Sequence, residues 1–117
     1  MERGDEHIGF GIMGGLNQPL AHGQFVSNFV DFGMNIQAAL EARRFTRQTA
    51  SGNDVSIESR IPSRTLEQLT ARSHEISIRR AYKQEMGRGQ AILHDSATGA
   101  ASDPRADGAA IPEPTSL

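Results

Sequence analysis

Apolar side chains alternate with glycine near the start of the chain, over residues 7–13. The apolar positions are Ile8, Phe10 and Ile12, and the glycines between them are Gly9 and Gly11. A period of two residues is typical of a β-strand, in which successive side chains point to opposite faces. One face of this predicted strand is therefore apolar, and the other is bare enough for a second backbone or a ligand to approach closely. The pair Gly14-Gly15 is expected to end the strand.

The period changes to that of a helix with one apolar stripe over residues 18–32. The stripe consists of Phe25, Val26, Phe29 and Val30, and it predicts core packing rather than a cofactor site. Pro19 fits the first turn, where its missing N–H costs nothing. Gly33 is expected to end this helix, and Asn35 to cap a short second helix through Leu40.

The rest of the chain predicts short strands, one further helix and hairpins. Strands are expected over 45–49, 55–58, 75–79 and 90–94, and a helix over 63–73. The first two of these strands are joined by the turn-rich segment 50–54, and Ala97-Thr98-Gly99 predicts a turn before another extended piece. The fold class expected from this pattern is α+β, with antiparallel strands.

Composition adds that the core is small. Leu, Ile, Val and Phe together make up 24 of the 117 residues, which is close to the ~20% below which highly charged chains tend to be disordered. The net charge of only −2 argues against disorder. We therefore expect one domain over 1–111 that leans on another polypeptide, followed by a flexible tail over 112–117.

Charge and residue types exclude several classes of function. The net charge of −2 does not predict a nucleic-acid partner, no apolar run predicts a membrane segment or a leader peptide, and the compartment is left open. The chain has no cysteine, and its four histidines are dispersed, so no metal site is expected. Asp103 and Asp107 flank a turn, where Asp103 is expected to accept backbone hydrogen bonds rather than to bind Ca²⁺.

Gly9, Gly11 and Gly14 match the G-x-G-x-x-G spacing of dinucleotide-binding turns. Such a turn needs a buried strand before its first glycine, whereas residues 1–7 are polar and charged, so the match is interpreted as accidental. Two readings of Gly14-Gly15 remain from the residues alone. The pair either makes a tight turn without chemistry or presents backbone N–H groups that hold a developing oxyanion.

Several blocks of the chain, taken in order, resemble the C-terminal part of the small subunit of γ-glutamyltransferases, also called γ-glutamyltranspeptidases. The blocks cover most of residues 8–111, and their joint match is more specific than any single motif. They are Gly9-Phe10-Gly11-Ile12-Met13-Gly14-Gly15, Gln18-Pro19, Asp31-Phe32-Gly33-Met34-Asn35, Ala38-Ala39-Leu40-Glu41-Ala42 with Arg44-Phe45, Glu58-Ser59-Arg60-Ile61-Pro62, Gly89-Gln90-Ala91-Ile92-Leu93, and Ala101-Ser102-Asp103-Pro104-Arg105 with Asp107-Gly108-Ala109-Ala110.

The resemblance implies part of an N-terminal-nucleophile hydrolase, an αββα sandwich with helices on one face of each sheet. Enzymes of that family cleave their own precursor and expose an N-terminal threonine on the small subunit. This threonine attacks γ-glutamyl amides such as glutathione, and the acyl group passes to water or amino acids. By the same resemblance, Gly14 and Gly15 supply the N–H groups of the oxyanion hole. Neither the resemblance nor any residue pattern calls for a cofactor.

The family's nucleophile lies in a Thr-Thr-His type segment upstream of the glycine strand, and this chain contains no such segment. Its threonines are Thr46, Thr49, Thr65, Thr70, Thr98 and Thr115. We therefore expect the isolated chain to be inactive, with the remainder of the small subunit and the large subunit as partners. The alternative is a non-catalytic remnant or interaction subunit that self-associates or binds a partner. A free-standing small-molecule binding module has only the glycine strand in its favour. The donor and acceptor substrates are left open.

Overall fold

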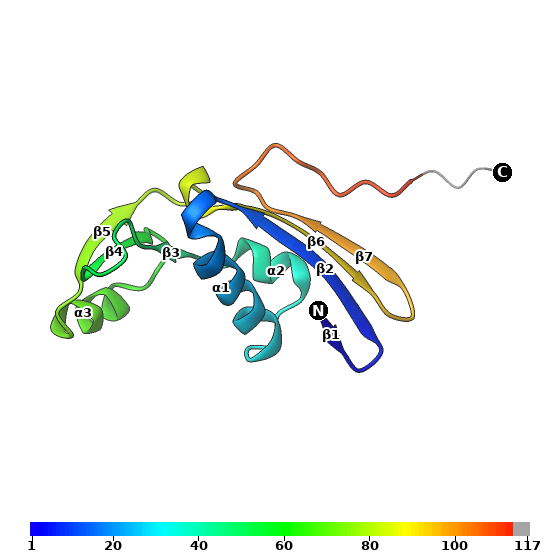
Figure 1. Ribbon diagram of the computed structural model, residues 1–117, viewed down its shortest axis with the longest axis horizontal. Coiled ribbons are helices and arrows are strands. Elements are labelled where there is room, and N and C mark those ends of the chain that lie inside the picture. The colour runs from blue at the N-terminus through cyan, green and yellow to red at the C-terminus, as the bar shows by residue number, and fades with distance from the viewer. Residues whose placement is uncertain (114–117) are drawn as a thin grey trace.

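The computed structural model describes residues 1–113 and contains two β-sheets and three α-helices (Figure 1). In chain order the elements are β1 (Glu2–Arg3), β2 (Glu6–Met13), the 3-10 turn η1 (Gly15–Asn17), α1 (Gln18–Val30), α2 (Ile36–Glu41), β3 (Phe45–Thr46), β4 (Asp54–Glu58), α3 (Ser63–Ala71), β5 (Glu75–Arg79), the 3-10 turn η2 (Gln84–Met86), β6 (Arg88–His94) and β7 (Thr98–Ser102). The predicted α+β class is therefore confirmed.

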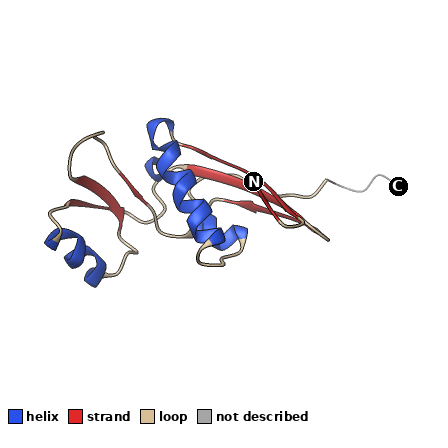
Figure 2. Cartoon of the chain, turned by 60° about the horizontal axis from the view of Figure 1, so that its bottom comes forward, coloured by secondary structure: helices blue, strands red, loops and turns tan. Residues whose placement is uncertain are grey.

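The larger sheet is antiparallel, with strand order β1-β2-β6-β7. Its central pair is in a register that places Phe10 opposite Ala91. Helices α1 and α2 cover one face of this sheet (Figure 2). The core between them is formed by Ile8, Ile12, Ala21, Phe25, Phe29, Ile36, Ala39, Leu40, Ala91 and Ala101. The alternation in β2 thus meets Phe25, Val26 and Phe29 of α1, as the pattern predicts, whereas Val30 of the predicted stripe is 44% exposed.

No helix or strand of residues 1–113 covers the opposite face of the larger sheet, where only the segment around Gly108 lies against Gln90 and Ser102. Gly9 and Gly11 lie on this face, and a Cβ built on either of them would meet no atom within 4 Å. Met13 and Ile92 are 60% and 55% exposed. The outer edge of β2 is not paired with a strand beyond Ile8, because β1 and the preceding Met1 pair only with residues 6–8. This sheet therefore has one packed face and one bare face with apolar side chains.

The smaller sheet has strand order β3-β4-β5. Strands β3 and β4 pair antiparallel, as the turn-rich segment between them predicts. Strands β4 and β5 pair parallel, with α3 as the crossover between them. This pair departs from the antiparallel arrangement expected for all strands. The departure arises because a helix returns the chain to the same end of the sheet before the next strand begins.

Local signals placed most boundaries within two or three residues. Asn35 caps α2, since its side-chain oxygen accepts a hydrogen bond from the Ala38 N–H at 2.8 Å. Gly33 has a φ of +63° shortly after the end of α1. Strand β3 ends at Thr46 rather than residue 49, because the Asp54 carboxylate draws the Gln48 N–H into the turn at 2.8 Å. The short strand β1 was not predicted, and β6 begins at Arg88, two residues before its expected start.

The molecule is elongated, with principal extents of 58 × 30 × 25 Å and a radius of gyration of 15.9 Å. A compact domain of this length has a radius of gyration of about 13 Å. Of the predicted tail, Pro112 and Glu113 are exposed and residues 114–117 lie outside the described residues. No helix within residues 1–113 is long and apolar enough to cross a membrane.

Candidate functional site

The glycine pair lies where the central strand of the larger sheet turns into a helix. Gly14 follows the last residue of β2, and Gly15 is the first residue of η1, which leads directly into α1. Gly15 has a φ of +58°, a conformation that costs side-chain-bearing residues roughly 1–2 kcal/mol. The strand therefore ends where the sequence predicted, and glycine is required there by the backbone.

The backbone N–H groups of Gly14 and Gly15 have no hydrogen-bond partner among residues 1–113. Gly15 is exposed and Gly14 is half-buried, so the turn lies at the surface. Both groups precede the N-terminus of α1, where aligned peptide dipoles produce a partial positive charge. Free N–H groups at a helix N-terminus are suited to an oxygen that carries negative charge.

The glycine turn is supported from behind by Gly87, which precedes β6. A Cβ built on Gly14 would lie 3.4 Å from the Cα of Gly87. Gly87 has a φ of +95°, and a Cβ built on it would lie 2.7 Å from Cγ2 of Ile12. A side chain at position 87 would therefore clash with Ile12 near the end of β2. The close approach of these two backbone segments therefore depends on glycine at position 87, whereas Gly14 has an extended backbone with a φ of 173° and room for an ordinary contact.

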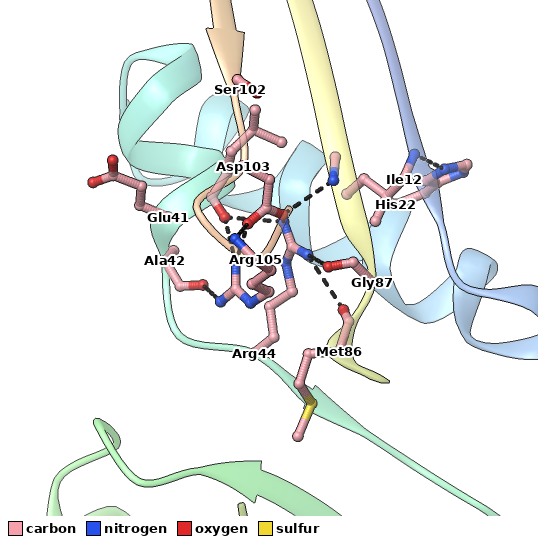
Figure 3. Close-up of polar contacts among 12 residues, drawn as sticks. Ile12, His22, Glu41, Ala42, Arg44, Met86, Gly87, Ser102, Asp103 and Arg105 are labelled. Carbon is pink, nitrogen blue, oxygen red and sulfur yellow. Dashed lines mark hydrogen bonds and ion pairs between the residues drawn. The ribbon is translucent and has the colours of Figure 1, made fainter. Parts of the chain in front are cut away.

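A buried arginine holds Gly87 in place (Figure 3). The Nη1 group of Arg44 donates hydrogen bonds to the carbonyl oxygens of Gly87 at 2.9 Å and Met86 at 3.3 Å. Its Nη2 group donates to the carbonyl of Leu40 at 2.9 Å and pairs with Asp103 Oδ2 at 2.8 Å. The Arg44 side chain is only 2% exposed. Arg44 therefore ties the start of β6 to α2 and to the turn after β7.

Three more charged side chains complete this buried network. Arg105 pairs with Glu58 Oε1 at 2.7 Å and with Asp103 Oδ1 at 3.0 Å. Arg60 donates to Glu58 Oε2 at 2.7 Å from the surface side. Asp103 also accepts the N–H groups of Gly89 and Arg105, so its predicted turn role is confirmed. These charges are tolerated in the interior because each carboxylate faces a guanidinium and backbone donors.

The pKa values of the network follow from burial and pairing. Burial lowers the pKa of the Arg44 guanidinium, and the charge of Arg105 lowers it further. Burial alone would raise the pKa of the Glu58 carboxyl, but the hydrogen bond and charge of Arg105 outweigh it and lower this pKa overall. The carboxylates of Glu58 and Asp103 conversely raise the pKa of Arg105 against the effect of burial. Glu58 is therefore held ionised, which suits a structural ion pair rather than a proton donor.

His22 covers part of the free edge of β2. Its Nε2 atom accepts a hydrogen bond from the N–H of Ile12 at 2.9 Å (Figure 3). Its ring stands edge-on to Phe10, with centroids 5.5 Å apart. The N–H of Ile12 requires an unprotonated Nε2. His22 is thus a histidine with its hydrogen bond satisfied, and the residue that it holds, Ile12, lies two positions before Gly14.

The threonines of the described chain do not meet the glycine turn with a free hydroxyl. Thr46 is buried and donates its hydroxyl to Asn17. Thr98 contacts His94 Nδ1 at 2.9 Å, but this exposed pair lies at the far end of β6. Because His94 is opposite His7 and Arg88 is opposite Met13, about 20 Å of strand separates the pair from Gly14. Within residues 1–113, no group of three potential metal-ligating side chains is found.

Known structures share the fold of this chain. The crystal structure of cephalosporin acylase from Bacillus halodurans matches with a TM-score of 0.77 and 38% identity, over 86% of this chain and 19% of that chain. The γ-glutamyltranspeptidase from Pseudomonas nitroreducens complexed with L-DON matches with a TM-score of 0.81 and 22% identity, over 97% of this chain and 58% of that chain. The fold is that of an N-terminal-nucleophile hydrolase.

Sequence comparison gives the family. The family model described as gamma-glutamyltranspeptidase matches residues 1–113. The chain belongs to the γ-glutamyltranspeptidase family. It is 28% identical over 113 residues to the "Glutathione hydrolase-like YwrD proenzyme" of Bacillus subtilis (strain 168), a match that covers 92% of this chain. The chain spans 22% of the length of that relative.

The supporting residues were only partly visible in the sequence. Arg44, Glu58, Asp103 and Arg105 all lie in blocks that resemble the family, but their mutual pairing did not follow from any local pattern. Gly87 and Asn17 were missed, because neither lies in a periodic segment. The available signal was the glycine at position 87 beside the start of a predicted strand, a sign of close backbone approach.

Proposed function

We propose that this chain supplies the oxyanion-stabilising glycine turn of an enzyme that transfers acyl groups from γ-glutamyl amides such as glutathione. The observation that carries the proposal is the pair of free N–H groups at Gly14 and Gly15, at the N-terminus of a helix. The nucleophile is a threonine hydroxyl on a polypeptide segment outside this chain. The remainder of the small subunit and the large subunit are the proposed partners.

In the proposed reaction, the threonine oxygen bonds to the amide carbonyl carbon, whose oxygen takes up negative charge. The N–H groups of Gly14 and Gly15 donate hydrogen bonds to that oxygen. The C–N bond then breaks, and the amine leaves with the proton that the hydroxyl gave up. Water or an amino acid next attacks the acyl-threonine and releases the γ-glutamyl group. Loss of one oxyanion donor typically costs about 10²–10³ in kcat.

The relatives support amide acyl transfer as the class of reaction. The names of the Bacillus subtilis and Pseudomonas nitroreducens proteins specify glutathione hydrolysis-like and γ-glutamyl transfer activities. The Bacillus halodurans protein, at 38% identity, is a cephalosporin acylase. A γ-glutamyl amide and an acylated cephalosporin both contain an amide carbonyl that an oxyanion turn polarises. The assay therefore compares both kinds of acyl-donor substrate.

The first experiment measures the isolated 117-residue chain with γ-glutamyl-p-nitroanilide. We expect no release of p-nitroaniline above a buffer control, because no free threonine hydroxyl of the described chain lies at the glycine turn. Release above the control would show that the chain carries its own nucleophile. It would overturn the assignment of this chain as a contributor to a larger site.

The second experiment restores a nucleophile by replacing the matched segment of the Bacillus halodurans acylase with residues 1–113 of this chain. The chimera is assayed with γ-glutamyl-p-nitroanilide and with an acylated cephalosporin. Gly15→Ala is compared with Gly4→Ala, which has nearly the same φ, +59° against +58°, and also open space around it. Gly15→Ala keeps the backbone N–H but strains its left-handed conformation, so we expect it to displace the donor and lower kcat about 100-fold, as a misplacement of roughly 1 Å does, and Gly4→Ala to leave kcat unchanged. Equal activity in the two variants would contradict the oxyanion role.

The bare face of the larger sheet supports a second candidate function. Met13 and Ile92 are exposed there, and the glycines beside them leave the backbone accessible. A non-catalytic remnant would use this face to self-associate or to bind a partner. Sedimentation of the isolated chain, with a hydrophobic dye as a second probe, tests this candidate. A compact monomer that does not bind the dye would count against it.

A further inference from the structure

Asn17 is a buried polar residue three positions after Gly14, and only 8% of its surface is exposed. Its backbone N–H donates to the carbonyl of Gly14 at 3.1 Å and closes the turn. Its side-chain Oδ1 accepts a hydrogen bond from the hydroxyl of Thr46 at 2.6 Å. Thr46 lies on β3 of the smaller sheet. Asn17 is therefore a hydrogen-bonded link from the glycine turn to the other sheet.

The side-chain amide nitrogen of Asn17 lies close to both Gly14 and Gly87. Nδ2 is 3.5 Å from the position that a Cβ would occupy at Gly14, and equally far from that position at Gly87. It has no hydrogen-bond partner among the described residues. A buried donor without a partner costs about 1–3 kcal/mol of stability. The unpaired Nδ2 group lowers the stability of the fold. We therefore look for the role of Asn17 in the bond that its Oδ1 forms with Thr46, which fixes the position of the turn.

We propose that Asn17 is a positioning residue, which fixes the N–H groups of Gly14 and Gly15 by anchoring their turn to Thr46. Thr46 is held in turn because β3 pairs with β4 through Ser56. The glycine turn is thus fixed relative to both sheets, and its N–H groups keep one orientation. The catalytic consequence of this role rests on the proposed oxyanion function, but the anchoring itself does not.

The variants separate anchoring from bulk stability. Thr46→Val removes the hydroxyl that donates a hydrogen bond to Asn17 but keeps the branched shape of the side chain, while Thr46→Ser retains the hydroxyl. The matched control is Gln37→Leu, because Gln37 also ties two elements together with two hydrogen bonds, to the backbone of Ser102 at 2.9 and 3.1 Å. Gln37 belongs to α2, and within residues 1–113 its side chain forms hydrogen bonds with Glu41 and Ser102 rather than with the glycine turn.

The first readout, in the full 117-residue chain, is the amide ¹H–¹⁵N signals of Gly14 and Gly15 together with the hydrogen exchange of the Asn17 amide, which is bonded to the Gly14 carbonyl. We expect Thr46→Val to shift both amide signals and speed exchange at Asn17, and Thr46→Ser to restore the original positions. Gln37→Leu should leave the two glycine signals unchanged. Unchanged glycine signals in a folded Thr46→Val variant, or equal shifts in Gln37→Leu, would overturn the proposal.

The second readout is the steady-state kinetics of the chimera with the acylase. We expect Thr46→Val to lower kcat by about 10- to 100-fold, as a slightly misplaced donor does, with KM changed less than twofold. Thr46→Ser should recover most of kcat. If the glycine signals shift but Gly15→Ala and Thr46→Val both retain full kcat, the anchoring stands and the oxyanion function fails. If Gly15→Ala loses kcat and Thr46→Val does not, the positioning role is wrong.

Discussion

The guanidinium of Arg44 donates a hydrogen bond to the carbonyl oxygen of Gly87 at 2.9 Å, and Gly87 in turn lies against the turn that carries the candidate oxyanion donors. A buried charge and a surface glycine turn are thus joined through one backbone segment. The ion pairs of Arg44 have a consequence beyond stability, because any shift of this arginine moves the backbone that supports Gly14. The glycine turn and the buried network therefore form one structural unit.

The contact between Gly87 and β2 predicts that even an alanine at position 87 destabilises the fold. Gly87→Ala places a Cβ 2.7 Å from Cγ2 of Ile12, at a φ of +95° that only glycine adopts readily. We expect the free energy of unfolding to fall by about 1–3 kcal/mol from backbone strain, with the clash as a further loss. Urea denaturation followed by circular dichroism measures the change.

The matched control is Gly23→Ala in α1, where the glycine is exposed and a Cβ would meet no atom within 4 Å. Alanine has the higher helix propensity, so this variant should be more stable by about 0.5–1 kcal/mol. Opposite signs for the two substitutions are the expected outcome. A Gly87→Ala variant as stable as the unchanged chain would show that the backbone at position 87 relaxes freely.

The buried ion pairs predict that neutralising one partner is costly. Glu58→Gln keeps the size of the side chain but removes one of the two opposite charges that face the buried guanidinium of Arg105, the other being Asp103. We expect a loss of about 3–5 kcal/mol in the free energy of unfolding. Glu67→Gln on the exposed part of α3 is the control and should change stability by less than about 0.5 kcal/mol. Similar values for the two variants would refute the structural role of the network.

The lowered pKa of Glu58 predicts how stability depends on pH. Its carboxyl has a folded-state pKa below the ordinary value of 4.5, so the unfolded chain takes up the proton first as the pH falls. The contribution of Glu58 is fully present above that ordinary value and is lost as the pH falls through the folded-state pKa. Across this acidic range, the free energy of unfolding should therefore fall more steeply with decreasing pH for the unchanged chain than for Glu58→Gln. Parallel curves would contradict the prediction.

The hydrogen bond between Ile12 and His22 predicts a local effect at the edge of β2. His22→Leu removes the acceptor of the Ile12 N–H, so the amide of Ile12 should exchange with solvent faster than in the unchanged chain. The stability loss expected from the unpaired N–H is about 1–3 kcal/mol. His22→Gln retains an acceptor oxygen and should preserve part of the protection. Protection at Ile12 that is unaltered by His22→Leu would mean that another group covers this edge.

Local structure was predictable where a few neighbouring residues decide it. The alternation over 7–13 identified β2, the stripe with Phe25 and Phe29 identified the buried side of α1, and the Asn35 cap was identified by its residue type. The turn at Gly14-Gly15 was expected from the glycines themselves. The parallel pairing of β4 with β5 was not expected, because sequence spacing shows the order of strands and not the direction in which they meet.

Of the candidate site, only the exposed glycine turn was predicted, and the residues that support it were not. The resemblance to the family pointed to Gly14 and Gly15, and the structure adds what lies behind them. Asn17 had no distinguishing pattern, and the glycine at position 87 indicated at most a close backbone approach, because the role of each residue depends on a partner far along the chain. Asn17 meets Thr46, and Gly87 meets both Gly14 and Arg44.

The sequence by itself therefore determined most of the strands and helices, because hydrophobic period, caps and glycine act over a few residues. It missed β1, and it predicted a turn at residues 97–99, where β7 already begins at Thr98. The tertiary structure alone decided which charges are buried together and which backbone segments support the glycine turn. Arg44, Glu58, Asp103 and Arg105 resemble ordinary surface charges in the sequence. They become a core only when α2, β4 and the turn after β7 converge, because an ion pair depends on distance in space and carries no periodic signal along the chain.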